Sequence, residues 1–223
     1  LLTGKDRKIL VDLGNGRKWS DKYKEIYGIE YNDVNIDRES ITDIILTHLH
    51  FDHAGGISFN DEKGKLLPTY PNATIHIQKS NVQNAKSPTR KEKASYLPEN
   101  VGALEFYAVN QLEGEQEVFP GIKVHLVSGH TRGQQWIEIY DKNERLYYPT
   151  DLIPTSHHLH PAFHMGYDNC AETVMREKET FLLNAEKSNA LIVFEHDVDV
   201  VCGRIKRDER NNFILTKGVN SEG

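Results

Sequence analysis

The amino-acid sequence predicts an α+β fold in a single domain that spans residues 1–223. Two observations indicate it. Short apolar or alternating runs separated by turn residues dominate the chain, and one long amphipathic stretch stands among them. A chain of this length can bury a sizeable core, and one domain is the default. Strands mixed with a few helices favour helices packed on sheets.

The predicted strands alternate with turn signals. The run 7–16 is apolar until Gly14 stops it, and the run 134–151 is expected to turn at 141–144 and return as a hairpin. A last hairpin is expected to turn near Asn211. This hairpin spans 200–216, and the remaining strand-like runs lie at 41–48, 73–80, 121–130 and 190–197.

The segment 171–187 has the periodicity of an amphipathic helix. Four apolar residues and one lysine recur at helical spacing and form a stripe that can face a core. These residues are Val174, Lys178, Phe181, Leu182 and Ala185. Asn169 is expected to cap the N-terminus of this helix. Shorter helices are expected near 20–27 and 78–85.

Composition and charge argue against several classes of protein. The formal net charge of −6 disfavours a nucleic-acid surface, and no stretch approaches the roughly 18 apolar residues that a membrane span needs. The two cysteines, Cys170 and Cys202, make no disulfide framework, which favours a reducing, cytoplasmic setting. The chain opens without Met and inside an expected strand pair, so we expect its N-terminus to be truncated.

The run "LTHLHFDHAGG" concentrates four groups that bind metals or transfer protons: His48, His50, Asp52 and His53. Two histidines that are two residues apart on a strand end point to the same side. The aspartate and the third histidine are expected in the turn that follows. The two glycines after them are expected to let the backbone turn tightly. Imidazole and carboxylate together suit zinc, iron, manganese or cobalt.

Three further candidate ligands end strand-like runs elsewhere in the chain: His130, Asp151 and His196. They are too far apart in sequence for local structure to explain the coincidence, so we expect a fold that brings strand ends to one edge. A catalytic zinc site needs about three protein ligands and an open position for water. The whole set of candidate ligands therefore divides into two sites that share one bridging carboxylate.

Taken in order, "ILVDLG", "HLHFDH", "GHT", "YPTD" and "FEHD" resemble the motifs of the metallo-β-lactamase superfamily. The resemblance implies an αββα sandwich with a dinuclear site at its edge. In this chain we expect the sandwich to lack, or not to show, its first strand pair. It assigns one cation to His48, His50 and His130, and the other to Asp52, His53 and His196, with Asp151 as the bridge. Asp12 would support the site from behind the ligands, although an aspartate there could also only cap a turn.

The resemblance implies hydrolysis by a hydroxide held between two divalent cations, zinc in the first place, with Asp52 passing a proton to the leaving group. The segments "THLHFDHAGG", "PNATIHI", "DLIPTSHH" and "MGYD" resemble the quorum-quenching acyl-homoserine lactonases, which favours a carboxylic-ester hydrolase that opens lactones. Many of these lactonases have a tyrosine that touches the substrate carbonyl. This chain has Pro154 there, and His157 or Tyr167 is expected to take its place.

Other functions stay open on the same scaffold. A mononuclear iron persulfide dioxygenase needs only His48, His130 and Asp151, and thioester or phosphodiester hydrolysis uses the complete ligand set. The acidic net charge disfavours a nuclease. We expect a small-molecule substrate and a cytoplasmic protein with no nucleic-acid or membrane partner, and a homodimer is left open.

Overall fold

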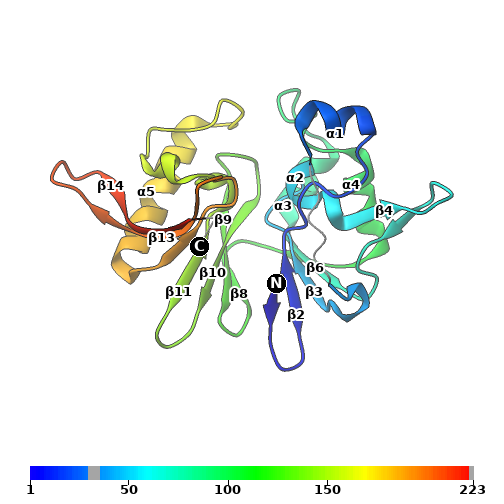
Figure 1. Ribbon diagram of the computed structural model, residues 1–223, viewed down its shortest axis with the longest axis horizontal. Coiled ribbons are helices and arrows are strands. Elements are labelled where there is room, and N and C mark those ends of the chain that lie inside the picture. The colour runs from blue at the N-terminus through cyan, green and yellow to red at the C-terminus, as the bar shows by residue number, and fades with distance from the viewer. Residues whose placement is uncertain (30–35, 221–223) are drawn as a thin grey trace. The chain divides into compact units, whose positions relative to one another are not determined.

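The computed structural model describes residues 1–29 and 36–220. Two compact units divide the chain, Leu1–Leu112 and Glu113–Gly223. In each unit Figure 1 shows strands gathered into a sheet with helices beside it. The predicted α+β class is confirmed. The prediction of a single domain is not tested by this division and stays a prediction.

The first unit is built on a five-stranded sheet with the order β1-β2-β3-β6-β7. These strands are β1 (Leu2–Thr3), β2 (Lys8–Val11), β3 (Asp43–Ile45), β6 (Thr74–Gln78) and β7 (Ala108–Leu112). β1 is antiparallel to β2, and all other neighbours are parallel. Because β2 and β3 run in the same direction, the loops that follow them leave from the same edge of the sheet. A separate antiparallel pair is formed by β4 (Ser58–Asn60) and β5 (Leu66–Pro68).

Short helices complete the first unit. They are α1 (Asp21–Tyr27), α2 (Phe51–Ala54), α3 (Lys79–Lys86) and α4 (Pro98–Gly102), with 3-10 turns η1 (Arg38–Ser40), η2 (Gly55–Ile57) and η3 (Ala103–Phe106). The helices predicted near 20–27 and 78–85 are therefore confirmed. The core is apolar: Ile44 and Ile75 on neighbouring strands are fully buried, and Val82 and Leu104 close over them.

The second unit is built on a seven-stranded sheet with the order β14-β13-β12-β11-β10-β9-β8. The strands are β8 (Gln116–Phe119), β9 (Ile122–Val127), β10 (Gln134–Tyr140), β11 (Arg145–Tyr148), β12 (Leu191–Val193), β13 (Val200–Arg207) and β14 (Phe213–Asn220). Both predicted hairpins are confirmed. β10 is antiparallel to β9 and to β11, and β11 is parallel to β12. Thus β9, β11 and β12 run in the same direction, and the loops after them leave from one edge.

The helix α5 (Ala171–Ser188) supplies the other half of the second core. Phe181 packs edge-to-face on Trp136, with ring centroids 4.9 Å apart. The predicted stripe is confirmed, including the buried Lys178. The predicted cap is wrong: Cys170 occupies the N-cap position, and the Asn169 amide donates instead to the His130 carbonyl oxygen at 3.0 Å. Two 3-10 turns, η4 (Thr150–Leu152) and η5 (Ser156–Leu159), precede this helix.

No helix within residues 1–29 and 36–220 has both the length and the apolar character needed to cross a membrane.

The role expected of Gly55 and Gly56 is wrong in its physical reason. Gly55 has φ −59°, which any residue adopts, and neither glycine has a positive φ. Both are required by close approach of the loop that follows β2. A Cβ on Gly55 would lie 2.1 Å from the Asn15 carbonyl oxygen, and a Cβ on Gly56 would lie 2.4 Å from that of Leu13. The two loops at this edge therefore touch backbone to backbone.

We predict that Gly55→Ala lowers the free energy of unfolding by about 3 kcal/mol, because the new methyl group meets backbone that cannot move aside. Gly102→Ala is the matched control, since a Cβ there meets nothing within 4 Å and the residue ends a helix. This control should be neutral or more stable. Urea unfolding of both variants measures the difference. Equal stabilities would contradict the proposed backbone contact.

Lys178 carries its ammonium group into the apolar side of α5. Its Nζ donates to the carbonyl oxygens of His160, at 3.0 Å, and Phe163. Burial lowers the pKa of Lys178 from 10.5 to about 8, against the attraction of the Asp168 carboxylate. Between these pH values the unfolded chain binds a proton that the folded chain has lost, so stability rises with pH.

We predict that the stability difference between the natural protein and Lys178→Met changes by on the order of 3 kcal/mol between pH 8 and pH 10.5, in favour of the natural protein. Urea unfolding at several pH values measures it. Burial also lowers the pKa of Lys18 to about 8. Its contribution to the pH dependence is the same in both proteins and cancels in their difference. A difference that does not change with pH would show that the Lys178 ammonium is solvated.

Candidate functional site

The four loops that carry the predicted ligands share one pattern. In each, the candidate ligand is the third residue after the end of a strand. The pairs are Ile45 and His48, Val127 and His130, Tyr148 and Asp151, and Val193 and His196. The prediction that ligands end their strands is thus corrected to a position just beyond them. Loop backbone, freed from the sheet ladder, can aim these side chains.

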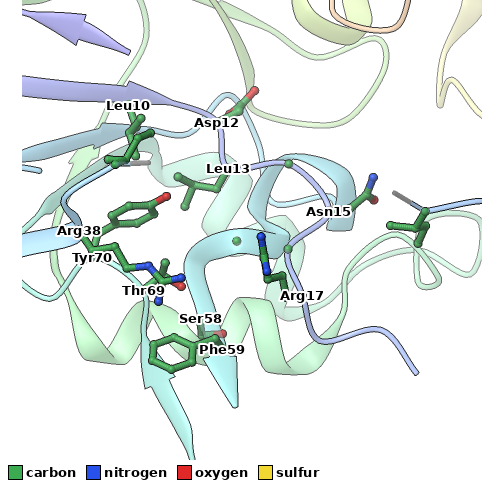
Figure 2. A pocket seen from close by; sticks show the side chains of 15 residues that line it. Leu10, Asp12, Leu13, Asn15, Arg17, Arg38, Ser58, Phe59, Thr69 and Tyr70 are labelled. Carbon is green, nitrogen blue, oxygen red and sulfur yellow. The ribbon is translucent and has the colours of Figure 1, made fainter. Parts of the chain in front are cut away.

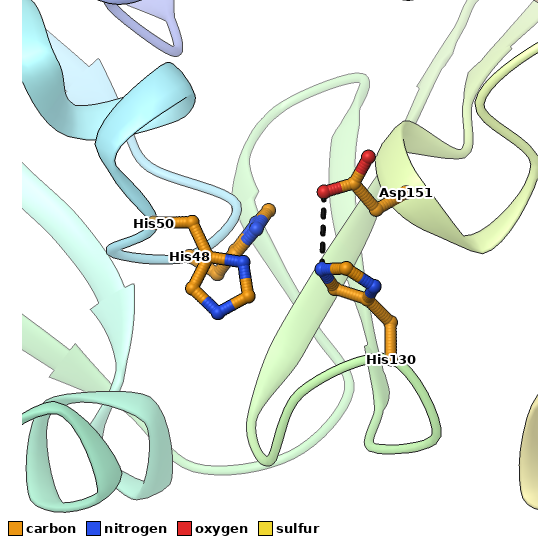
Figure 3. Close-up of side chains that lie close together, drawn as sticks. All are labelled: His48, His50, His130 and Asp151. Atoms are coloured by element: carbon orange, nitrogen blue, oxygen red, sulfur yellow. Dashed lines mark ion pairs between the residues drawn. The ribbon is translucent and has the colours of Figure 1, made fainter. Parts of the chain in front are cut away.

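In the first unit, one loop and one short helix hold three imidazoles close together. The ring of His48 lies 4.4 Å from that of His50 and 4.0 Å from that of His53, between centroids. All three are buried. The expected strand geometry for His48 and His50 is wrong, because β3 ends before them; Figure 3 shows both on the loop. Asp52 lies on α2 rather than in a turn, with Oδ2 3.7 Å from Nε2 of His53.

Asp12 stands behind this group. It follows β2 with φ 49°, a left-handed conformation that aspartate tolerates better than most residues. Its carboxylate accepts the Thr47 N–H at 2.8 Å and the Thr47 hydroxyl at 2.7 Å. It also lies 3.0 Å from Nδ1 of His53. A carboxylate only accepts, so Nδ1 carries the proton and Nε2 presents its lone pair.

The same loop is held from its other side by α3 and the residues before α4. The Leu49 N–H donates to the Asn81 side chain at 2.9 Å, and that amide donates to the Tyr96 hydroxyl at 3.2 Å. The Tyr96 ring in turn packs against His50, with centroids 4.7 Å apart. The Phe51 N–H donates to the Ser95 carbonyl. The loop that carries the histidines is therefore held by hydrogen bonds to Asp12 on one side and to Asn81 and Ser95 on the other.

In the second unit, Asp151 lies between two imidazoles. Its Oδ2 is 3.1 Å from Nε2 of His130, and its Oδ1 is 3.2 Å from Nε2 of His196. Figure 3 marks the first of these ion pairs. His130 and Asp151 are buried, whereas the His196 side chain is 36% exposed. Each carboxylate oxygen thus faces a different histidine.

Asp168 is a functional candidate that the sequence reasoning missed. Its Oδ1 lies 2.8 Å from Nδ1 of His130, and its Oδ2 accepts the Met165 N–H at 2.8 Å. Burial disfavours a charged imidazole, but the carboxylates of Asp151 and Asp168 raise the pKa of His130 to about 9. The site therefore favours a positive charge at this ring, whether a proton or a metal cation. Asp168 lies in the segment "MGYD", which resembles the lactonases, but no sequence pattern identifies this aspartate as the partner of a histidine.

The predicted substrate residues lie in the segment between Asp151 and α5. His157 is exposed on η5. Tyr167 is 62% exposed, and its ring lies edge-on to His130 with centroids 6.0 Å apart. Pro154, which stands where a tyrosine was expected, is buried and accepts the His196 N–H at 3.0 Å. Its backbone fixes a candidate ligand.

A separate cavity of about 430 Å³ lies within the first unit. Figure 2 shows Arg17 and Arg38 at it, with the Asp12 side chain turned away from them. Its described lining includes none of the candidate ligands after β3. The cavity therefore lies behind the Asp12 loop and apart from the clustered imidazoles.

The donors fit divalent cations. The first unit offers imidazole nitrogen and carboxylate oxygen, and the second offers the same two kinds of donor. Such mixed sets suit zinc, iron, manganese or cobalt. Asp12 and Asp168 hold the Nδ1 sides of His53 and His130, as carboxylates behind metal-binding histidines commonly do.

The family model that describes the metallo-beta-lactamase superfamily matches residues 1–196. The chain belongs to the metallo-beta-lactamase superfamily. The predicted family and fold are therefore confirmed.

The chain is also similar to curated relatives and to solved structures. The chain is 28% identical over 170 residues to an N-acyl homoserine lactonase of a Bacillus species, a match that covers 74% of this chain and 60% of the relative. The chain thus spans less than two thirds of the relative's length. A probable metal-dependent hydrolase from Staphylococcus aureus superposes with TM-score 0.81 at 24% identity, over 97% of this chain and 80% of the other. A dizinc quorum-quenching lactonase, AidC, gives TM-score 0.75 at 23% identity, over 96% and 76%.

We predict that Asp12→Ala lowers the free energy of unfolding by about 2–3 kcal/mol, because it leaves buried Thr47 donors without an acceptor. Asp12→Asn should lose less, since its oxygen still accepts and asparagine tolerates the positive φ. Asp6→Ala, at an exposed aspartate of the β1–β2 turn, is the control. Urea unfolding compares them, and an Asp12→Ala variant as stable as the control would refute this role.

Proposed function

We propose that this chain is a metal-dependent hydrolase that opens lactones or related carboxylic esters. The observation that carries the proposal is Asp151, which offers one oxygen toward His130 and the other toward His196. Family membership supports hydrolysis, and the name of the matched relatives, N-acyl homoserine lactonase, supports acyl-homoserine lactones as the substrate class. The substrate would be a small molecule, and the role would be quorum quenching.

The two donor sets would together hold two divalent cations. One cation would take His48, His50 and His130, the other Asp52, His53 and His196, and Asp151 would bridge them. Zinc is the first choice because imidazole and carboxylate suit it. A cytoplasmic location and a homodimer stay predictions.

When bound, the cations would supply Lewis-acid polarisation of the substrate carbonyl and a water of lowered pKa. The remaining work falls to side chains of this chain. With a cation bound, Asp12 and Asp168 would hold the proton at Nδ1 of His53 and His130, so that Nε2 of each ring would be left to the cation. Asp52, half-buried beside His53, would pass a proton to the leaving alkoxide. Tyr167, whose ring lies edge-on to His130, or the His157 imidazole would donate to the substrate carbonyl.

We predict about two equivalents of metal per chain and ring opening of homoserine or γ-lactones. His48→Ala and Asp151→Ala should each reduce the rate to that of the uncatalysed reaction. Asp141→Ala is the control: it lies in the β10–β11 turn, at the opposite end of β11 from Asp151, and its carboxylate accepts the turn N–H groups of Asn143 and Glu144. Metal analysis and a panel of lactone, aryl ester, thioester and phosphodiester substrates provide the measurements.

Two outcomes would overturn the proposal. Lactone hydrolysis that survives both substitutions would show that the proposed ligands do not carry the reaction. A single iron per chain, with oxygen uptake on glutathione persulfide and no hydrolysis, would instead identify the mononuclear dioxygenase.

A further inference from the structure

The loop that carries His130 is gripped by α5 through backbone hydrogen bonds. Glu177 accepts the N–H of Ser128 at 2.7 Å with one carboxylate oxygen and the N–H of Gly129 at 3.0 Å with the other. These are the two residues directly before His130. One carboxylate on the helix therefore fixes both peptide groups that lead into the candidate ligand.

Close packing explains why this grip is tight. A Cβ on Gly129 would lie 2.4 Å from the Val174 backbone nitrogen, so the loop and the first turns of α5 touch without an intervening side chain. The turn before the helix adds to the grip. The backbone and side-chain N–H groups of Asn169 both donate to the His130 carbonyl oxygen, at 3.1 and 3.0 Å. The main chain of His130 is thereby fixed on both sides.

The next residue of the helix acts on the imidazole by another route. The Lys178 Nζ donates to the carbonyl oxygens of His160 and Phe163. These carbonyls belong to the segment that ends in Asp168, whose Oδ2 accepts the Met165 N–H and whose Oδ1 bonds to Nδ1 of His130. Lys178 thus holds the segment from which Asp168 reaches the ring.

A lysine at position 178 is unfavourable for stability. It lies on the stripe formed by Val174, Phe181, Leu182 and Ala185, and its side chain is almost fully buried. An apolar residue would fill that position without desolvating an ammonium group. A buried lysine departs from the apolar pattern of the stripe and is unfavourable for stability, which indicates a role beyond packing.

We infer that Glu177 and Lys178 are positioning residues for His130: Glu177 sets its main chain, and Lys178 sets its imidazole through Asp168. This inference rests on the proposed function, in which His130 binds a cation. Both residues act through others and need touch neither cation nor substrate.

The test uses Lys178→Met and Glu177→Gln in the full chain. Lys178→Met keeps the stem and removes the donors, and Glu177→Gln keeps one acceptor and removes the other. Exposed residues of the same helix give the matched controls, Lys187→Met and Glu179→Gln. Zinc affinity is measured by competition with a chromophoric chelator, and urea unfolding reports stability. We expect both variants to bind zinc about tenfold more weakly or worse, as loss of partners behind a ligand commonly does, with the controls unchanged.

A double-substitution cycle separates positioning from packing. If Lys178 acts through Asp168, then Lys178→Met should add little to the loss of zinc affinity already caused by Asp168→Asn. Additive losses, or a Lys178→Met variant with natural affinity, would overturn the inference for Lys178. Natural affinity in Glu177→Gln would overturn it for Glu177.

A second readout needs no metal. In protein with ¹⁵N-labelled histidine, the Nδ1–H of His130 should give a slowly exchanging NMR signal that Lys178→Met makes exchange faster, at a pH where both proteins are folded. The controls should leave it unchanged. If the natural protein bound no cation, the proposed function would fail, yet this signal would still report whether Lys178 orders the ring. An unchanged signal in Lys178→Met would overturn the inference.

Discussion

The direction of strands is the constraint on which the candidate site depends. In the first unit β2 and β3 are parallel, so Asp12 and the histidine loop leave from one edge of their sheet. In the second, β9, β11 and β12 run in the same direction, because an antiparallel strand separates the first two and the last pair is parallel. His130, Asp151 and His196 therefore leave from one edge although they are far apart in sequence. Without that alignment, none of their contacts would form.

Carboxylates behind the imidazoles orient the rings and fix the positions of their protons. Asp12 in one unit and Asp168 in the other each hold the Nδ1 atom of a histidine and also accept a backbone N–H. A carboxylate fixes both the orientation of the ring and the position of its proton, so Nε2 is left to bind a cation. Two unrelated loops thus use the same arrangement, a carboxylate at Nδ1, because in each the imidazole must be oriented with Nε2 toward the cation.

In each unit, some residues near the candidate ligands are unfavourable for stability by themselves. Gly55 and Gly56 lack side chains so that two loops can touch, and Asp12 has a positive φ. Lys178 places an ammonium group in an apolar core, where its pKa is lowered to about 8. Each of these choices is unfavourable by itself. The glycines and Asp12 are compensated by contacts with the loops they join, and Lys178 by hydrogen bonds to the segment that ends in Asp168.

The sequence by itself determined the α+β class, the family, the helix at 171–187 and both hairpins, because periodicity and turn residues act locally. It also named the candidate ligands, four from the donor-rich run "HLHFDH" and three from later motifs that end strand-like runs. The resemblance also predicted Asp12 behind the ligands, but tertiary structure alone revealed Asp168. Asp168 meets His130 through a turn that no periodicity encodes, and Asn169 gives its amide to His130 rather than to a helix end. The glycines after His53 serve close contact with a loop about 40 residues away in the chain, and contacts between distant segments leave no repeating pattern that a single sequence can reveal.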